Sequence, residues 1–194
     1  DGFSTPKIQG KMSLRASITG EIVLDDVFVP EENLLPNVEG LKGPFGCLNN
    51  ARFGIAFGAI GAAEFCWFAA RDYTMDRKQF GQAIAGFQAN QFKLADMATE
   101  LEAARLMIHA AAARLDAKDP EATVHCAMAK RFATDAGFRI CNDALQLHGG
   151  YGYLMDYPIE RFVRDTRVHQ ILEGTNEIMR LIIARRILGG WQLA

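Results

Sequence analysis

The chain has 194 residues, which at about 150 residues per domain is room for one domain, or for one domain and a fragment of another. Lys and Arg number 21 and Asp and Glu number 23, and this near balance argues against a dedicated nucleic-acid-binding protein, whose surface would be basic. Apolar residues make up 49% of the chain, which is the composition of a globular protein with a sizeable core and excludes a disordered one.

Three further features concern compartment and completeness. The longest charge-free apolar stretch, residues 53–63, is eleven residues long, whereas a membrane-spanning helix needs about 20, so no membrane span is expected. The four cysteines form no C-x-x-C pair, which predicts reduced thiols in a bacterial cytoplasm or a mitochondrial matrix. The chain begins with Asp1 and shows neither a signal peptide nor an Arg-rich presequence, so we expect a further part upstream.

The first part of the chain is strand-like. Residues 22–24 and 27–29 are β-prone runs, and the turn-forming pair Asp25 and Asp26 separates them. Two or three strands are too few to form a stable sheet alone. Pro30 and Pro36 end this region, because proline lacks the N–H that a sheet requires, and the sequence therefore divides into 1–36 and 37–194.

The second part is helical, and its clearest helix spans residues 87–117. Apolar residues recur there at alternating steps of three and four, which predicts an antiparallel bundle seam. The seam positions are Leu94, Met97, Leu101, Ala104, Ile108, Ala111 and Leu115.

Three more helices complete a predicted four-helix bundle. One runs from Pro44 to Asp76, and one has Asp119 as N-cap, Pro120 as its first helical residue and an end at Gly149. The last spans 176–188.

The helix that follows Pro44 also contains a stripe of small residues. Gly54, Gly58 and Gly61 keep helical spacing, which favours close helix packing over a nucleotide-binding loop. The overall prediction is a mainly α fold, an antiparallel four-helix bundle preceded by a few strands.

Two segments could face a ligand. Residues 76–81 end a helix with Arg77 and Lys78, which either complement the helix dipole or present an Arg fork to a phosphate. Residues 146–153 contain three glycines in four positions, and a helix C-cap explains Gly149 or Gly150 but not both together with Gly152. A loop that lets a ligand approach the backbone is the other interpretation.

A third segment, residues 171–177, places Glu173 after two apolar residues and before a glycine and a helix start. Glu173 is either a solvated loop acid or a general base, since apolar neighbours disfavour the charged form of a carboxylate. Asn49 and Arg52, by default, lie on a solvated helix face. The four histidines have no partner at i+3 or i+4, so we expect no metal site and take each one as a surface or satisfied buried residue.

These segments together resemble the C-terminal half of the acyl-CoA dehydrogenase family, and the likeness covers essentially the whole chain. The residues that carry it are 76–81, 146–152, 173–175 and the strand and linker segment 2–36. Residues 8–11 and 43–52 look like glutaryl-CoA dehydrogenase, whereas 95–99 and 169–177 look more like isobutyryl-CoA and other short branched-chain dehydrogenases. The resemblance makes 1–36 the end of the middle β-domain and 37–194 the helical bundle domain.

The resemblance implies an FAD-dependent enzyme that converts an acyl-CoA thioester to the 2,3-enoyl-CoA, with Glu173 as catalytic base. It implies that Thr175 and Glu177 touch the enzyme's own FAD. Five other positions match those that reach the FAD of a neighbouring subunit: Arg77, Phe80, Gln88, Gln146 and Gly150. Substrate contact is implied for Asn49, Arg52 and Gly174.

The implied partners are an acyl-CoA, an electron-transfer flavoprotein as electron acceptor and further copies of the chain in a homotetramer. Two alternatives remain at this point. One is a non-catalytic helical oligomerisation module, which would need only the apolar seam, and the other is an acyl-CoA oxidase.

Overall fold

The computed structural model describes residues 1–189, apart from the side chain of Asn49. The chain divides into two compact units, Asp1–Gly46 and a second that begins at Cys47. All four cysteines are free thiols.

The first unit contains a small antiparallel pair, β1 (Phe3–Ser4) with β2 (Val23–Leu24), in which Phe3 lies opposite Leu24. A short 3-10 helix, η1 (Glu31–Asn33), follows. The strand predicted at 22–24 is thus confirmed at its last two residues. The strand predicted at 27–29 is wrong: the pairing with β1 ends at Leu24, and Asp26, two residues further on, adopts a left-handed φ of 50°.

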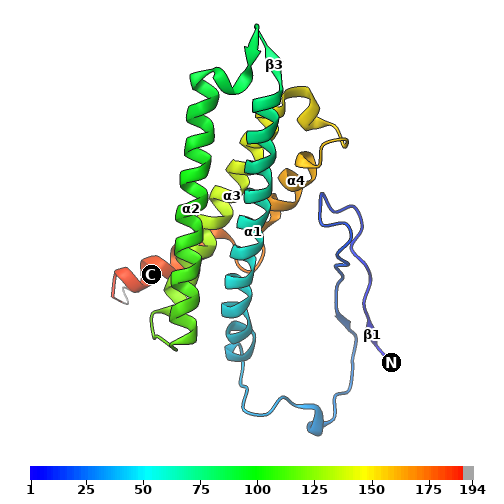
Figure 1. Cartoon of the computed structure of the whole chain (residues 1–194). Helices are drawn as coiled ribbons and strands as arrows, with labels where there is room; N and C mark the ends of the chain where they lie inside the picture. The colour runs from blue at the N-terminus through cyan, green and yellow to red at the C-terminus, as the bar shows by residue number, and fades with distance from the viewer. Residues whose placement is uncertain (190–194) are drawn as a thin grey trace. The chain divides into compact units, whose positions relative to one another are not determined.

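The second unit is helical, which confirms the predicted fold class. The α-helices are α1 (Lys42–Asp76), which begins in the last residues of the first unit, α2 (Gln88–Asp116), α3 (Ala122–His148), α4 (Ile159–His169) and α5 (Asn176–Ile187). The long helices α1, α2 and α3 run side by side, and α3 also packs against α4 and α5 (Figure 1). The described residues thus contain five α-helices where four were expected. The sequence signal for α4 consists of only three apolar residues after Pro158, namely Ile159, Phe162 and Val163.

The core lies between α1, α2 and α3 and is built from small side chains. The seam predicted on α2 is confirmed, with its central five positions buried and Leu94 and Leu115 half-buried at its ends. Alanines and the buried cysteines Cys66, Cys126 and Cys141 fill the facing positions on α1 and α3. Small residues allow the three helix backbones to approach one another closely.

The glycine stripe of α1 does not pack as expected. Gly54, Gly58 and Gly61 are exposed, and a Cβ atom at Gly54 or Gly61 would meet nothing within 4 Å. The close approach between α1 and α3 occurs instead at Gly137, where a Cβ would lie 3.0 Å from the carbonyl oxygen of Ala59. Helical spacing alone does not show which face of a helix meets the core.

The connections between helices agree in part with the sequence-based predictions. The expected helix start at Asp119 is wrong, because Asp119 forms a turn in which its carboxylate accepts from the Glu121 N–H at 2.8 Å and α3 begins at Ala122. The end of α3 at Gly149, with φ 60°, is confirmed. The segment 76–81 continues into a hairpin, β3 (Lys78–Gln79) with β4 (Gln82–Ala83), whose loop residues Phe80 and Gly81 both have positive φ.

Within the described residues, α1 is long and apolar enough to cross a membrane by length and composition alone. Core helices of soluble proteins pass the same test, and α1 contributes buried residues to the core. The absence of a membrane span therefore stays a prediction.

Candidate active site

The turn that carries Glu173 connects α4 to α5 and has an uncommon backbone. Glu173 has φ 56° and Gly174 has φ 90°, so two successive residues occupy the left-handed region, which favours glycine. The N–H of Leu172 donates to the carbonyl of Val168 at 2.9 Å, and that of Asn176 to Gln170 at 3.0 Å. The turn is therefore fixed at both ends, with the Glu173 side chain half-buried.

Arg52 brings α1 to this turn. Its Nε donates to the carbonyl oxygen of Glu173 at 3.1 Å, and only 8% of the residue is exposed. Burial lowers the pKa of Arg52, while the charge of Glu173 acts in the opposite direction. A Cβ on Gly174 would lie 2.9 Å from the Met179 side chain and 3.8 Å from the guanidinium, so the turn, Arg52 and α5 pack closely. The default interpretation of Arg52 as a solvated residue is wrong.

Lys130 of α3 is the principal site residue that the sequence did not predict. It is fully buried, and its Nζ donates to the carbonyl oxygen of Gly174 and to Oδ1 of Asn176, both at 2.9 Å. Burial lowers the pKa of Lys130 to about 8, opposed chiefly by the charge of Asp135. The available signal was a cation on a helix face otherwise made of small residues, such as Cys126 and Ala133.

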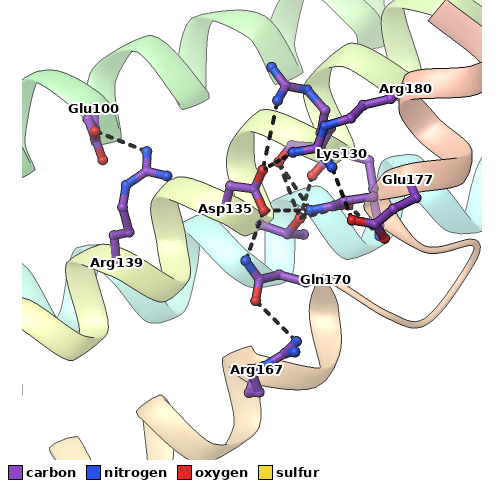
Figure 2. Close-up of polar contacts among 11 residues, drawn as sticks. Glu100, Lys130, Asp135, Arg139, Arg167, Gln170, Glu177 and Arg180 are labelled. Atoms are coloured by element: carbon purple, nitrogen blue, oxygen red, sulfur yellow. Dashed lines mark hydrogen bonds and ion pairs between the residues drawn. The ribbon is translucent and has the colours of Figure 1, made fainter.

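A polar network extends from Lys130 across three helices (Figure 2). The Asn176 side chain donates to Asp135 at 2.7 Å, and Asp135 also accepts from Gln170 at 2.8 Å. Arg180 of α5 lies 3.5 Å from the same carboxylate. The network connects α3 to both ends of the Glu173 turn.

Thr175 and Glu177 flank the start of α5. Thr175 is the N-cap, and its hydroxyl accepts from the N–H of Ile178 at 3.4 Å, at the helix start expected there. Glu177 is exposed and forms an ion pair with Arg180 at 3.3 Å. Asn49 lies in α1, but its side chain is outside the described part of the structure.

The second group of predicted residues gathers elsewhere, around a cavity of about 630 Å³ lined by Arg77, Gln146 and Gly150. The β3–β4 hairpin and the 3-10 helix η3 (Gly149–Tyr153) contribute to the same cavity, so it lies at the hairpin end of the bundle (Figure 1). Phe80, at the hairpin tip, is 92% exposed, and Gln88 is exposed at the start of α2. The three-glycine segment thus borders a cavity, whereas Gly152 is required by packing, since its Cβ would lie 2.5 Å from the Leu145 carbonyl.

Aromatic rings that the sequence did not single out support this cavity. Tyr73 of α1 stacks on His148 with ring centroids 4.3 Å apart, and Arg77 lies 5.6 Å from the centre of the Tyr151 ring. Burial raises the pKa of Tyr73, with the Arg77 charge opposing. An exposed ring, a guanidinium and an amide around an open space fit an aromatic, anionic ligand such as FAD.

The histidines need one correction. His148 is buried and satisfied, since its Nδ1 lies 2.8 Å from the carbonyl oxygen of Ala144. His169 differs: its Nδ1 is buried without a hydrogen-bond partner among the described residues, and burial lowers its pKa. No group of three or more metal-ligating side chains occurs in the part of the chain that the structure describes.

Known proteins resemble this chain in both sequence and fold. The chain is 49% identical over 187 residues to the mitochondrial isobutyryl-CoA dehydrogenase of Dictyostelium discoideum, covering 96% of this chain and 45% of that enzyme. A chain in a structure of the electron transferring flavoprotein of Acidaminococcus fermentans is 45% identical, with TM-score 0.91, over 96% of this chain and 49% of that one.

A glutaryl-CoA dehydrogenase of Mycobacterium smegmatis, solved in complex with FADH2, is 35% identical with TM-score 0.92, over 100% of this chain and 50% of that chain. The chain therefore spans about half the length of the relatives it matches. The protein-family model described as acyl-CoA dehydrogenase, C-terminal domain, matches residues 39–188. With a helical fold of this kind and a family match over most of its length, the chain belongs to the acyl-CoA dehydrogenase family.

Proposed function

We propose that the protein carrying this chain is an FAD-dependent dehydrogenase that converts a short branched acyl-CoA, of the isobutyryl type, to the 2,3-enoyl-CoA, with Glu173 as the base. The observation that carries the proposal is the turn itself: a carboxylate on a left-handed backbone whose carbonyls are bonded by Arg52 and Lys130. A solvated loop acid needs no such support. A rigidly held base is what proton abstraction from a weakly acidic carbon requires.

The chain's own part in the reaction is proton removal. The carboxylate of Glu173 takes the proton from the carbon α to the thioester carbonyl, and the carbon–carbon double bond forms as the hydrogen on the β carbon leaves as hydride. Accepting that hydride is the chemistry that FAD supplies when bound. The half-buried position of Glu173 limits water around the carboxylate before the proton is transferred.

Cofactor and substrate contacts are proposed on two separate surfaces. Thr175 and Glu177 would hold the FAD that works with Glu173. At the hairpin end of the bundle, Arg77, Gln146 and Gly150 line the cavity, where Arg77 would bind a phosphate of the FAD of a neighbouring subunit. Phe80, which would stack on a ring, and Gln88 are exposed outside the cavity lining and would reach the same FAD. Asn49, Arg52 and Gly174 would lie on the substrate side. The two surfaces support a homotetramer whose subunits share cofactors.

Relatives support the finer assignments. The 49% identity to an isobutyryl-CoA dehydrogenase favours a branched substrate over glutaryl-CoA. The similarity to a chain in a flavoprotein structure supports an electron-transfer flavoprotein as acceptor, as opposed to oxygen in an oxidase. A mitochondrial relative fits a matrix location, and a bacterial cytoplasm fits equally.

The test is Glu173→Gln in the protein encoded by the complete gene. The substitution keeps the shape of the side chain and removes its basicity, so FAD and acyl-CoA still bind while flavin reduction slows by about 10²–10⁴-fold. Stopped-flow bleaching of the flavin band with isobutyryl-CoA and with glutaryl-CoA measures both the role and the preference.

Glu102→Gln is the matched control, because Glu102 is a surface acid of α2 that is 61% exposed. Bleaching close to the wild-type rate in Glu173→Gln with both substrates would end the assignment of Glu173 as base. Faster bleaching with glutaryl-CoA would instead replace the proposed substrate.

A further inference from the structure

Two buried cations from two different helices donate hydrogen bonds to two successive carbonyl groups of the turn that carries the proposed base, Glu173. Arg52 of α1 donates to the Glu173 carbonyl at 3.1 Å, and Lys130 of α3 donates to the Gly174 carbonyl at 2.9 Å. Contacts 121 and 44 residues apart in sequence thus meet at one turn. Any movement of this turn would displace the carboxylate of Glu173, because the side chain is carried by this backbone.

The turn needs such support because its backbone is strained. A residue with a side chain is disfavoured at φ 56°, and Glu173 occupies this conformation directly before Gly174 at φ 90°. Strained conformations persist only where the surrounding structure fixes them.

Burial of Lys130 is costly, so its contacts need an explanation. A lysine without exposed surface loses its hydration, and among the described residues its hydrogen-bond acceptors, the Gly174 carbonyl and Asn176 Oδ1, replace it. An apolar residue at this position would fill the space between α3 and α5 without that cost. What it could not do is bond to the carbonyl of the turn.

The amide of Asn176 is oriented by the same helix that carries Lys130. Its nitrogen donates to Asp135 at 2.7 Å and to the hydroxyl of Thr134 at 2.9 Å, which leaves Oδ1 directed at the ammonium. Lys130 is thereby held between the turn and the first residue of α5. Lys130 interacts electrostatically with charged or titratable groups from every neighbouring element. These groups are Arg52, Asp135, His169, Glu173 and Glu177.

We propose that Lys130 is a positioning residue for the reaction, which clamps the Glu173–Gly174 turn and so holds the base in its reactive orientation. The proposal rests on the proposed function, since it assigns to Lys130 an effect exerted through Glu173.

The test is Lys130→Met in the protein encoded by the complete gene. The expected result is flavin reduction at saturating acyl-CoA at least tenfold slower than in wild type, because a small displacement of a catalytic group is costly. The FAD content and the Kd for acyl-CoA stay within about threefold. A second measurement, amide hydrogen exchange of a peptide covering residues 170–179, becomes at least tenfold faster while α2 is unchanged.

Ile140→Ala is the matched control for lost stability, because Ile140 is buried on the same helix ten residues from Lys130. It lowers stability without slowing reduction or loosening the turn. Should Lys130→Met fail to retain FAD, Lys130→Gln, which keeps a donor toward the Gly174 carbonyl, is expected to retain FAD and to restore both flavin reduction and slow exchange of residues 170–179. Fast exchange of these residues in Lys130→Gln would refute the clamp.

Glu173→Gln separates this proposal from the function on which it rests. If that variant loses reduction while Lys130→Met reduces flavin normally, the proposed function stands and the role of Lys130 is refuted. Equal slowing in Ile140→Ala and Lys130→Met also refutes it, because a general loss of stability would then explain both. Normal reduction in Glu173→Gln refutes the base and the clamp together.

Discussion

A lysine without exposed surface is rare, and Lys130 has a consequence for stability that is independent of catalysis. Burial lowers its pKa from 10.5 to about 8, which the charge of Asp135 only partly offsets. Between these two pH values the unfolded chain still holds a proton that the folded chain has released. The unfolded state therefore binds more protons, and this group makes folding stability rise as pH increases from about 8 to 10.5.

Lys130→Met removes this dependence. The difference in unfolding free energy between wild type and Lys130→Met is expected to shift in favour of wild type by up to about 3 kcal/mol across this window. Urea unfolding of both proteins at pH 7.5, 9 and 10.5 measures it. Lys118→Met changes an exposed lysine, so its unfolding free energy should change with pH in parallel with that of wild type. The same parallel pH dependence in Lys130→Met would show that Lys130 is not desolvated in solution.

At the scale of helices, α1 and α3 place glycine in two different roles. Gly137 of α3 allows the backbone of α1 to approach, since a Cβ there would lie 3.0 Å from the Ala59 carbonyl oxygen and 3.5 Å from its Cβ. Gly61 of α1 has open space around it and interrupts a helix whose neighbouring position, Ile60, is buried. One glycine is needed by packing and the other lowers helix propensity.

The two alanine variants should therefore have opposite signs. Gly137→Ala forces α1 and α3 apart and is expected to lower stability by about 1–3 kcal/mol. Gly61→Ala is expected to raise the stability of this chain by about 0.5–1 kcal/mol, because alanine is the better helix former. Urea unfolding monitored by circular dichroism compares them. Destabilisation by Gly61→Ala at a dilution at which the chain is monomeric would contradict the open space around Gly61.

At the scale of the whole molecule, large apolar side chains remain exposed on α1. Phe57, Phe65 and Phe68 are 36%, 45% and 42% exposed and come from one stretch of the helix. Clustered exposed aromatic residues are typical of a surface that another protein part covers. They are consistent with a chain that spans about half the length of its relatives.

We accordingly expect the chain by itself to self-associate. Light scattering at micromolar concentration should give a mass above that of one 21.4 kDa chain, and Phe68→Ser should reduce it. Thr99→Ser, which changes an exposed position of α2 conservatively, is the control. A stable monomer would count against subunits that share cofactors.

The sequence by itself determined the elements whose signals are local. Periodic apolar residues fixed α2, Thr175 fixed the start of α5, and Gly149 fixed the end of α3, because each signal acts within one or two helical turns. The family and the position of Glu173 were likewise accessible from short motifs. The short helix α4 and the strand β1 were missed, since a few residues carry too weak a pattern.

Only the tertiary structure decided which residues meet. Lys130 reaches Gly174 across 44 residues, and Arg52 reaches Glu173 across 121, so no local pattern could connect them. The face of α1 that meets α3 was likewise set by packing: Ala59 faces Gly137, whereas the glycine stripe is exposed. Burial and long-range contact arise from the simultaneous packing of several helices. For this reason the structure, and no local pattern in the sequence, shows that Lys130 lies beside the turn of the proposed base, Glu173.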